Sequence, residues 1–426
     1  MNSYIKLGTL GVLALVMTGC ADTTVEYFPV EKPQSVIDYE YLNEYGPLKS
    51  YIDRQAHPGF LLGTGVGAGD YLNKGLIYRV TNSNFDQMTA GNEMKYASIV
   101  QDDGTMDFTT VENFVAAAEE AGMQIYGHTL LWHAQQNATW LKSCIADLVD
   151  DEEGTVAQKQ YKILDAELER WIEGMMNATR GYVKAWDLMN EGLDDTGGDI
   201  PLKTTPEKPG AQDFYWQDYL GENYVRNAVK YARKYYAQQE GANPADLKLF
   251  INDYNLEAAY NNNDKAKSLV NWIKKWEADG ETKIDGIGSQ MHVSYSCNPT
   301  EQKRREDAVV NMLNILANSG KLVRITELDM GIDDAEGEAI NTADVTLEQH
   351  KAMGEYYKFI ISKYFEIIPV AQQYGICHWA QTDANAKSGW RGGCPIGLWT
   401  EYNAAAGSGF SRKPAYGSFC EALAGK

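Results

Sequence analysis

The chain alternates short apolar runs with longer amphipathic stretches along most of its 426 residues. The apolar runs that we expect to form strands number eight, at 60–66, 84–88, 124–128, 183–190, 248–252, 286–292, 323–327 and 375–381. Amphipathic helices are expected at 111–121, 166–178, 224–239, 265–278, 304–318 and 347–364. Strands alternating with helices predict parallel βαβ units, and eight units close into an α/β fold of the (β/α)8 TIM-barrel type. An open doubly wound sheet is the alternative, but it rarely needs eight units without a glycine-rich turn.

The first 20 residues are expected to be a targeting segment rather than part of the fold. Lys6 precedes an apolar run at 7–17, which is too short to span a membrane and ends in Thr18-Gly19-Cys20. Glycine directly before cysteine resembles a bacterial lipobox, so we expect a lipoprotein signal peptide over 1–20 and a lipid anchor at Cys20. An ordinary cleaved signal with an incidental cysteine is the alternative. Residues 21–45 would then be a tether, and 46–426 a single barrel domain.

The charge balance excludes several classes of partner. With 59 acidic and 38 basic residues the net charge is −21, so the surface repels phosphate backbones and nucleic acid is not expected to bind. A strongly anionic substrate is also disfavoured, whereas a neutral polysaccharide is unaffected. Because no zinc-type spacing, P-loop or G-x-G-x-x-G motif occurs, no metal or cofactor is expected. The cysteines after Cys20 are odd in number, so at least one stays unpaired: Cys144, Cys297, Cys377, Cys394 and Cys420.

Two glutamates stand at the ends of two expected strands. Glu191 follows the run 183–190, and Glu327 ends the run 323–327. Active sites of such barrels lie at the C-terminal ends of the strands, and the fourth and seventh strands face each other across a barrel of eight. Two carboxylates flanking one bond are what glycoside hydrolysis requires. A single such glutamate would more often be a solvated charge or a helix cap. We interpret Asp187 as a supporting residue and Asp329 as a loop acid.

Seven segments carry polar residues at the expected strand ends. They are 92–96 (NEMKY), 127–135 (GHTLLWHAQ), 186–191 (WDLMNE), 251–255 (INDYN), 285–292 (DGIGSQMH), 325–329 (ITELD) and 413–416 (KPAY). In this order they resemble glycoside hydrolase family 10, the β-1,4-xylanase family, over about 48–424. One segment alone would be a weak signal, whereas seven in the right order are specific.

This resemblance implies a retaining endo-1,4-β-xylanase that acts through a covalent glycosyl-enzyme. Glu327 would be the nucleophile and Glu191 the general acid/base, with Asn190 on the sugar 2-hydroxyl and His292 holding Glu327. Further substrate-binding residues are implied: Asn92, Lys95, His128, Gln135 and Gln290 on the glycone side, Tyr254 and Asn255 on the aglycone side, and Trp132, Trp379 and Trp390 as walls. We expect an exported monomer that binds xylan or xylo-oligosaccharides. We expect its lipid anchor to lie in a bacterial membrane, with the outer membrane as the first choice, and the protein to face the periplasm or the cell surface.

The chain departs from the family pattern at four places. Gly91 stands where a glutamate is usual, Tyr126 stands where an arginine is usual, and 136–140 lacks the usual proline. The loop between Trp379 and Trp390 is also longer than usual. These departures concern the distal glycone contacts rather than the reaction centre. Two other functions stay open: an enzyme acting on β-1,4-glucan or only on short xylo-oligosaccharides, and a glycan-binding lipoprotein on an inactive barrel.

Overall fold

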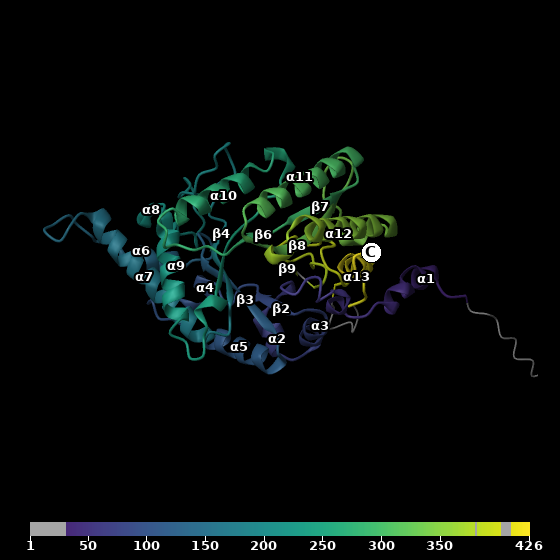
Figure 1. Ribbon diagram of the computed structural model, residues 1–426, viewed down its shortest axis with the longest axis horizontal. Helices are drawn as coiled ribbons and strands as arrows, with labels where there is room; N and C mark the ends of the chain where they lie inside the picture. Colours follow the sequence, from purple (N-terminus) through teal and green to yellow (C-terminus); the bar gives the residue numbers. More distant parts are fainter. Residues whose placement is uncertain (1–30, 380, 402–409) are drawn as a thin grey trace, which may run out of the picture. The chain divides into compact units, whose positions relative to one another are not determined.

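The computed structural model describes residues 31–379, 381–401 and 410–426 (Figure 1). The expected signal peptide and Cys20 lie outside the described residues, so the lipid anchor stays a prediction. The chain divides into a unit Met1–Asp38 and a unit Tyr39–Lys426, and the latter holds the barrel. This second unit includes residues that we expected in the tether: Leu42 is buried, and Arg412 donates hydrogen bonds to the carbonyls of Leu42 and Tyr45 at 2.9 and 2.6 Å.

The core is a closed parallel barrel. Its strands are β1 (Leu61–Val66), β2 (Gln87–Ala90), β3 (Gln124–Leu131), β4 (Ala185–Asn190), β5 (Lys248–Asp253), β6 (Gly286–Ser289), β7 (His292–Ser296), β8 (Leu322–Asp333) and β9 (Gln373–His378). Neighbours pair in parallel, and β9 pairs with β1, so that the ring closes. β6 pairs with the first part of β8 and β7 with its second part, so β6 and β7 together make one of eight barrel positions. The predicted (β/α)8 fold is confirmed, and the open-sheet alternative is wrong.

Helices surround the barrel (Figure 1). They are α2 (Ala68–Leu72), α3 (Leu76–Asn84), α4 (Tyr96–Ile99), α5 (Thr109–Ala121), α6 (Ala138–Cys144), α7 (Val156–Thr179), α8 (Trp216–Leu220), α9 (Tyr224–Tyr236), α10 (Asp264–Glu277), α11 (Pro299–Asn318), α12 (Leu347–Ile367) and α13 (Pro414–Leu423). A further helix, α1 (Gln34–Glu40), spans the boundary between the two units. Short 3-10 helices lie at η1 (Tyr41–Glu44), η2 (Leu48–Tyr51), η3 (Pro244–Asp246), η4 (Ala259–Asn261), η5 (Thr342–Asp344) and η6 (Val370–Gln372). All six predicted helices are present. Their ends differ from the predicted ends by up to ten residues, and the largest difference is at the start of α7, which was predicted at 166 and lies at Val156.

Local sequence signals explain where the two long helices α7 and α12 begin. The Thr155 hydroxyl accepts a hydrogen bond from the backbone N–H of Gln158, and the Thr346 hydroxyl accepts one from the backbone N–H of Gln349. In each pair the glutamine side-chain oxygen accepts a second bond from the backbone N–H of the threonine. Such capping boxes satisfy amide groups that a helix start leaves unpaired. Leu168 and other apolar residues of α7 are buried, as expected for an amphipathic helix packed on a sheet.

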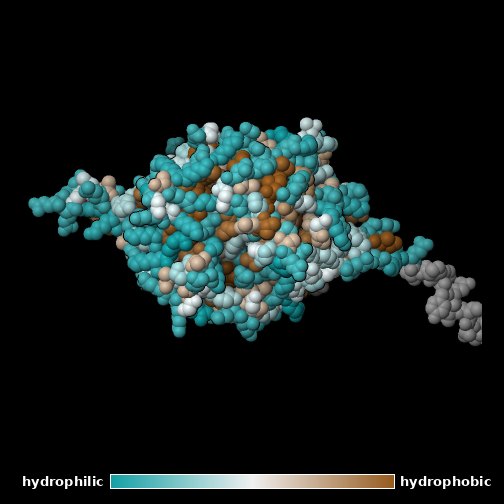
Figure 2. Space-filling view, in the orientation of Figure 1, coloured by the Kyte–Doolittle hydropathy of each residue, from teal (hydrophilic) through white to brown (hydrophobic). Residues whose placement is uncertain are grey.

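The outer surface is mostly hydrophilic on the face seen in Figure 2, with hydrophobic residues gathered toward its middle. No helix among residues 31–379, 381–401 and 410–426 is long and apolar enough to cross a membrane. Inside the barrel, close packing requires glycine at one point near the site: a Cβ at Gly127 would overlap the ring of Trp186. Gly127 precedes His128 on β3, so this close approach fixes how that strand delivers its histidine.

Candidate active site

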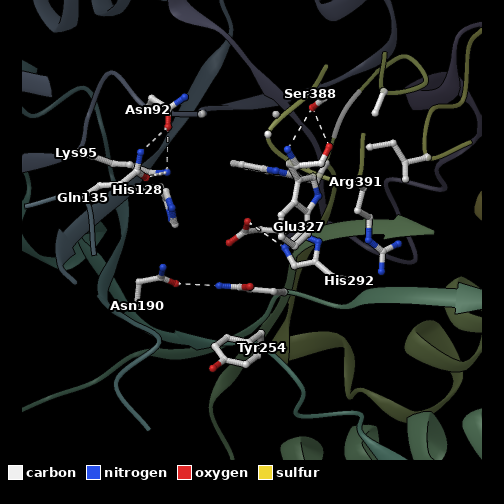
Figure 3. A pocket seen from close by; sticks show the side chains of 18 of the residues that line it. Asn92, Lys95, His128, Gln135, Asn190, Tyr254, His292, Glu327, Ser388 and Arg391 are labelled. Carbon is white, nitrogen blue, oxygen red and sulfur yellow. Dashed lines mark hydrogen bonds and ion pairs between the residues drawn. The ribbon is translucent and has the colours of Figure 1, made fainter. Parts of the chain in front are cut away.

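A cleft of about 1170 Å³ opens at the carboxyl ends of the barrel strands. Both predicted catalytic glutamates line it, as do all twelve predicted substrate-binding residues: Asn92, Lys95, His128, Trp132, Gln135, Asn190, Tyr254, Asn255, Gln290, His292, Trp379 and Trp390. Figure 3 shows Glu327 near the middle of the cleft. Asn92, Lys95 and Gln135 lie together on one side of it, and Tyr254 lies on a different side. The fold therefore gathers side chains from every part of the sequence into one place.

Glu191 directly follows β4 and turns its side chain into the cleft. Its backbone has a φ of 54°, which is uncommon for a residue other than glycine, and its amide donates to the Asn252 carbonyl at 2.8 Å. The carboxylate accepts hydrogen bonds from Gln290 Nε2 at 2.8 Å and from Trp132 Nε1 at 3.0 Å. Two donors, one just after β3 and one between β6 and β7, thus hold a half-buried carboxyl group that faces the cleft.

Glu327 lies within β8 and is 6% exposed. Asn252 Nδ2 donates to its Oε1 at 3.2 Å, and His292 Nε2 lies 3.5 Å from its Oε2. Burial alone would raise the pKa of Glu327, but the contact with His292 and the charges of His128 and Lys95 lower it to about 2. The group is therefore ionised in the free protein, as a carboxylate nucleophile must be.

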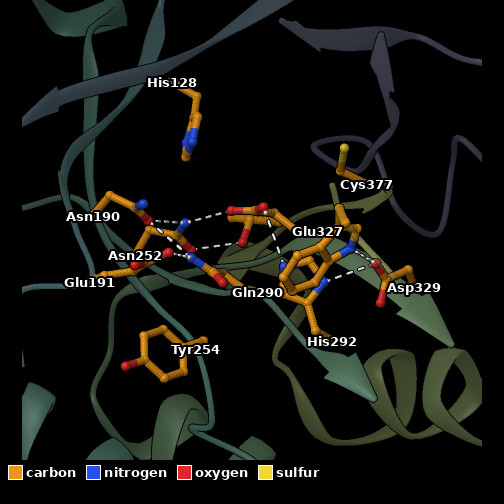
Figure 4. A network of polar contacts seen from close by, with 12 residues as sticks. His128, Asn190, Glu191, Asn252, Tyr254, Gln290, His292, Glu327, Asp329 and Cys377 are labelled. Carbon is orange, nitrogen blue, oxygen red and sulfur yellow. Dashed lines mark hydrogen bonds and ion pairs between the residues drawn. The ribbon is translucent and has the colours of Figure 1, made fainter. Parts of the chain in front are cut away.

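His292 carries a positive charge held between two carboxylates (Figure 4). Burial would lower its pKa, but Asp329, whose Oδ2 lies 3.0 Å from Nδ1, and Glu327 raise it to about 10. Asp329 also accepts a hydrogen bond from Trp390 Nε1 at 2.7 Å, and an Arg391 nitrogen lies 3.2 Å from its other oxygen. The prediction that Asp329 is a loop acid is wrong, because β8 continues to Asp333 and Asp329 is fully buried within it.

Three amide side chains connect the two glutamates (Figure 4). Asn252 Nδ2 donates to Asn190 Oδ1 at 2.9 Å as well as to Glu327. Gln290 Nε2 donates to Asn190 Oδ1 at 3.2 Å as well as to Glu191. Asn190 therefore receives two hydrogen bonds on its oxygen, while its own NH₂ group donates none within the described part of the chain. That NH₂ group remains available to a ligand hydroxyl.

One side of the cleft carries a cluster built on Lys95. Its Nζ donates to Gln135 Oε1 at 2.7 Å and to Asn92 Oδ1 at 3.3 Å, and it lies 4.8 Å from the Trp132 ring centre. Burial lowers the pKa of Lys95, although Glu327 and other carboxylates act in the opposite direction. The cluster presents an ammonium and two amides, which suit the hydroxyl groups of a sugar.

His128 is held from below by a buried acid. Its Nδ1 lies 2.8 Å from Asp187 Oδ2, and the Tyr126 hydroxyl donates to Asp187 Oδ1 at 2.6 Å. Asp187 is 1% exposed, so it fixes the histidine ring and does not itself line the cleft. Its place agrees with a supporting role.

The other side of the cleft holds an ionic cluster around Tyr254. The Tyr254 hydroxyl donates to Asp195 at 2.6 Å, and Lys203 Nζ donates to that hydroxyl at 3.1 Å. Lys265 pairs with Asp195 at 2.7 Å and with Asp253 at 3.0 Å. Tyr254 is thus fixed in place at the edge of the cleft.

Several cleft residues were not predicted from the sequence. Lys203 belongs to the long loop after Glu191, where its backbone N–H donates a hydrogen bond to the Gly192 carbonyl at 2.9 Å and its side chain lines the cleft. His133 also lines the cleft; its ring lies 5.0 Å from that of Tyr215, and burial lowers its pKa to about 3, so it is neutral. Others come from the loop before Ile396: Ala384, Asn385, Ser388, Gly389 and Arg391. No strand-end pattern marks these loop positions.

Within the described residues, no group of three or more His, Cys, Asp or Glu side chains is placed to hold a metal ion. The described cysteines are all free thiols: Cys144, Cys297, Cys377, Cys394 and Cys420.

A parallel eight-strand barrel with a pair of supported glutamates at its carboxyl end is the arrangement that glycoside hydrolases of the (β/α)8 class use. The model of Glycosyl hydrolase family 10 matches residues 52–422, and the chain belongs to this family.

The chain is similar to Endo-beta-1,4-xylanase Xyn10C of Cellvibrio japonicus, with 28% identity over 312 residues, which cover 72% of this chain and 45% of that protein. It is 31% identical over 326 residues to Endo-1,4-beta-xylanase A of Thermotoga maritima, covering 74% of this chain and 26% of that protein. Among solved structures, mutant xylanase10C from Cellvibrio japonicus in complex with xylopentaose matches with a TM-score of 0.68 and 25% identity, covering 90% and 70% of the two chains. The chain spans less than half the length of the first two relatives.

Proposed function

We propose that the chain is a retaining endo-1,4-β-xylanase. The observation that carries this proposal is the pair of supported glutamates, with Glu327 ionised beside His292 and Glu191 held at the cleft by Trp132 and Gln290. Binding groups lie on both sides of the pair, so a polysaccharide can pass through and be cut internally. The family of the chain, and the xylanases to which the chain is similar, support xylan as the substrate.

The reaction follows from the two glutamates in two steps. In the first step the Glu327 carboxylate attacks the anomeric carbon while protonated Glu191 gives its proton to the departing glycosidic oxygen. The bond to the leaving sugar breaks and a glycosyl ester on Glu327 forms. In the second step Glu191, now ionised, takes a proton from water, whose oxygen attacks the same carbon and releases Glu327. Two displacements at one carbon retain its configuration.

Asn190 and His292 support this sequence of steps. The free NH₂ group of Asn190 is placed to donate to the 2-hydroxyl of the sugar under attack, and such a bond is worth most where charge develops in the transition state. The charge of His292 keeps Glu327 ionised until it attacks. After ester formation His292 remains paired with Asp329, so the imidazolium is not left alone in a buried site.

The decisive experiment measures reducing-sugar release from xylan by the purified protein and by Glu327→Ala. We expect release by the wild type, retention of the β-configuration in the first product seen by NMR, and loss of activity with retained xylan binding in the variant. Cleavage of cellulose but not xylan would favour the β-1,4-glucan alternative. Xylan binding by the wild type without release would favour a glycan-binding protein, and inversion would exclude the two-step mechanism.

We also propose that the protein is exported as a monomer and is lipid-anchored at Cys20. The basic residue Lys6, the apolar run 7–17 and the Gly19-Cys20 pair support this placement. Cells given labelled palmitate should incorporate label into the wild type but not into Cys20→Ala, and only the wild type should sediment with membranes. An unlabelled wild type would contradict the anchor, and a light-scattering mass well above 47.5 kDa for the detergent-free variant would contradict the monomer.

A further inference from the structure

An exposed tyrosine stands just beyond the Tyr254 side of the cleft. Tyr260 lies in η4, in the loop between β5 and α10, and is 64% exposed. Its hydroxyl accepts a hydrogen bond from Asn255 Nδ2 at 3.0 Å. Asn255 lines the cleft, whereas Tyr260 is not among the described residues that do. The ring therefore adjoins the cleft from outside.

The charges around Tyr260 place it on the same side as the Tyr254 cluster. Burial of part of the ring raises the pKa of Tyr260, and the charge of Asp195 raises it further. Asp195 is the acid that holds the Tyr254 hydroxyl. Tyr254 and Tyr260 thus both lie near Asp195, the first as a lining residue of the cleft and the second outside its lining.

The loop that carries Tyr260 is anchored to the body of the barrel. Asn263 is 1% exposed, and its Nδ2 donates to the carbonyls of Leu256 at 2.9 Å and Ala308 at 3.0 Å. Its Oδ1 accepts from Asn311 at 2.8 Å. Asn262 and Asn263 both have φ above 50°, a conformation that asparagine tolerates better than most residues. The loop is pinned to α11, so the ring is held in place before any ligand arrives.

Single exposed aromatic side chains are common and need no explanation by themselves. Tyr260 differs because it is at once highly exposed, fixed by a cleft residue and carried on an anchored loop. A ring tied by its hydroxyl edge still offers its apolar faces to a ligand, and flat aromatic rings pack against the C–H faces of pyranose sugars. A tyrosine so placed combines a large contact surface with a small loss of side-chain freedom.

We propose that Tyr260 is a stacking platform for a xylose residue of the aglycone chain, one position or more beyond the sugar that meets Tyr254 and Asn255. This inference rests on the proposed xylanase function. The platform acts only on substrates long enough to reach it, so it adds affinity for long chains and leaves the chemistry at Glu191 and Glu327 unchanged.

The test compares kcat/KM for xylohexaose and xylotriose in wild type and Tyr260→Ala. We expect the xylohexaose value to fall about three- to tenfold, the range of a well-placed aromatic contact, while the xylotriose value stays within about twofold. Cleavage of xylohexaose should move toward its reducing end, because binding modes with many aglycone sugars lose their outermost contact. Tyr260→Phe, which keeps the ring, should retain most of the wild-type value.

Tyr161→Ala is the matched control. Tyr161 is 41% exposed on α7, and its hydroxyl also accepts from an asparagine, Asn227 Nδ2, at 3.0 Å. It lines no part of the cleft, so neither substrate should respond to its loss. Equal xylohexaose values in wild type and Tyr260→Ala, or an equal fall for xylotriose, would overturn the platform.

A binding measurement separates this inference from the proposed function. Calorimetry of xylohexaose with Glu327→Ala, and with the same variant that also carries Tyr260→Ala, reads the platform without catalysis. We expect Kd to rise about three- to tenfold in the double variant. If the wild type cuts xylan but the two Kd values agree, the platform fails and the function stands. If Kd rises but the wild type releases no sugar, the function fails and the platform stands.

Discussion

Replacing His292 with glutamine should raise the pKa of Glu327 and shrink the active pH range from its acid side. Burial opposes ionisation of Glu327, yet His292, His128 and Lys95 bring its pKa from the usual 4.5 to about 2. This difference amounts to about 3 kcal/mol in favour of the carboxylate. His292 is charged throughout the acid and neutral range, because its own pKa is raised to about 10. Without it we expect about half of that energy to be lost, which moves the acid limb up by about one to two pH units.

The assay is kcat/KM against pH on an aryl β-xylobioside, whose leaving group needs little protonation, so that the acid limb reports Glu327. A glutamate with a lowered pKa is active above that pKa and inactive below it. Raising the pKa must therefore move the limb to higher pH and not to lower pH. His57→Gln is the control, because His57 precedes β1 at the opposite end of the barrel and lies 2.6 Å from Gln373 Oε1. Acid limbs that coincide for wild type and His292→Gln would refute this account of Glu327.

Further predictions address the general acid, the amide bridge and the barrel packing. Glu191→Ala should lower kcat on xylan about 10²- to 10⁴-fold; on an aryl β-xylobioside, whose leaving group needs little protonation, added azide should restore turnover and yield a β-glycosyl azide by NMR. On xylan the wild-type pH profile should be bell-shaped, since Glu191 must be protonated and Glu327 ionised; a flat profile would contradict these roles. Asn252→Ala removes a donor to Glu327 and should lower kcat/KM about five- to hundredfold with an unchanged circular dichroism spectrum. Gly127→Ala forces a methyl group onto the Trp186 ring and should lower the free energy of unfolding in urea by about 1–3 kcal/mol.

The sequence was informative where a local pattern coincides with the site. β4 ends in polar residues that line the cleft, so Glu191 and Asn190 could be placed from their own segment. The sixth barrel position was predicted as one strand, 286–292, but it consists of β6 and β7 with a break between them. Met291 has a φ of 57° at this break. This left-handed backbone conformation is not one that an apolar side chain predicts. The break matters, because it turns Gln290 toward Glu191.

The start of the second strand was predicted too early for a similar reason. Residues 84–88 were expected to be extended, but Asn84 ends α3 and β2 begins at Gln87. The Asn84 side chain donates to the Val80 carbonyl at 2.9 Å, and its Oδ1 accepts from the Leu48 amide and the Tyr416 hydroxyl. Two of these partners come from remote segments, so no window of local sequence could reveal the helix end.

Asp329 was missed because its environment is made by a neighbouring strand. β7 pairs with the second part of β8, and His292 lies opposite Asp329 in that register. This pairing extends β8 beyond Glu327 and buries the acid next to His292. Strand register between distant segments depends on the whole barrel, whereas the local sequence after Glu327 reads simply as an acid beyond a strand end.

The departure at Tyr126 has a spatial explanation that a position-by-position comparison cannot give. In place of the usual arginine on β3, Arg324 of β8 reaches across the barrel and places its guanidinium carbon 3.6 Å from the Tyr126 ring centre. Arg324 is 1% exposed, and its charge acts on Asp187, which holds both the Tyr126 hydroxyl and His128. A cation beneath the Asp187–His128 pair is thus supplied from another strand. Because the barrel interior brings opposite strands together, a cation lies beside Tyr126 and acts on Asp187 although β3 itself carries no arginine at this position.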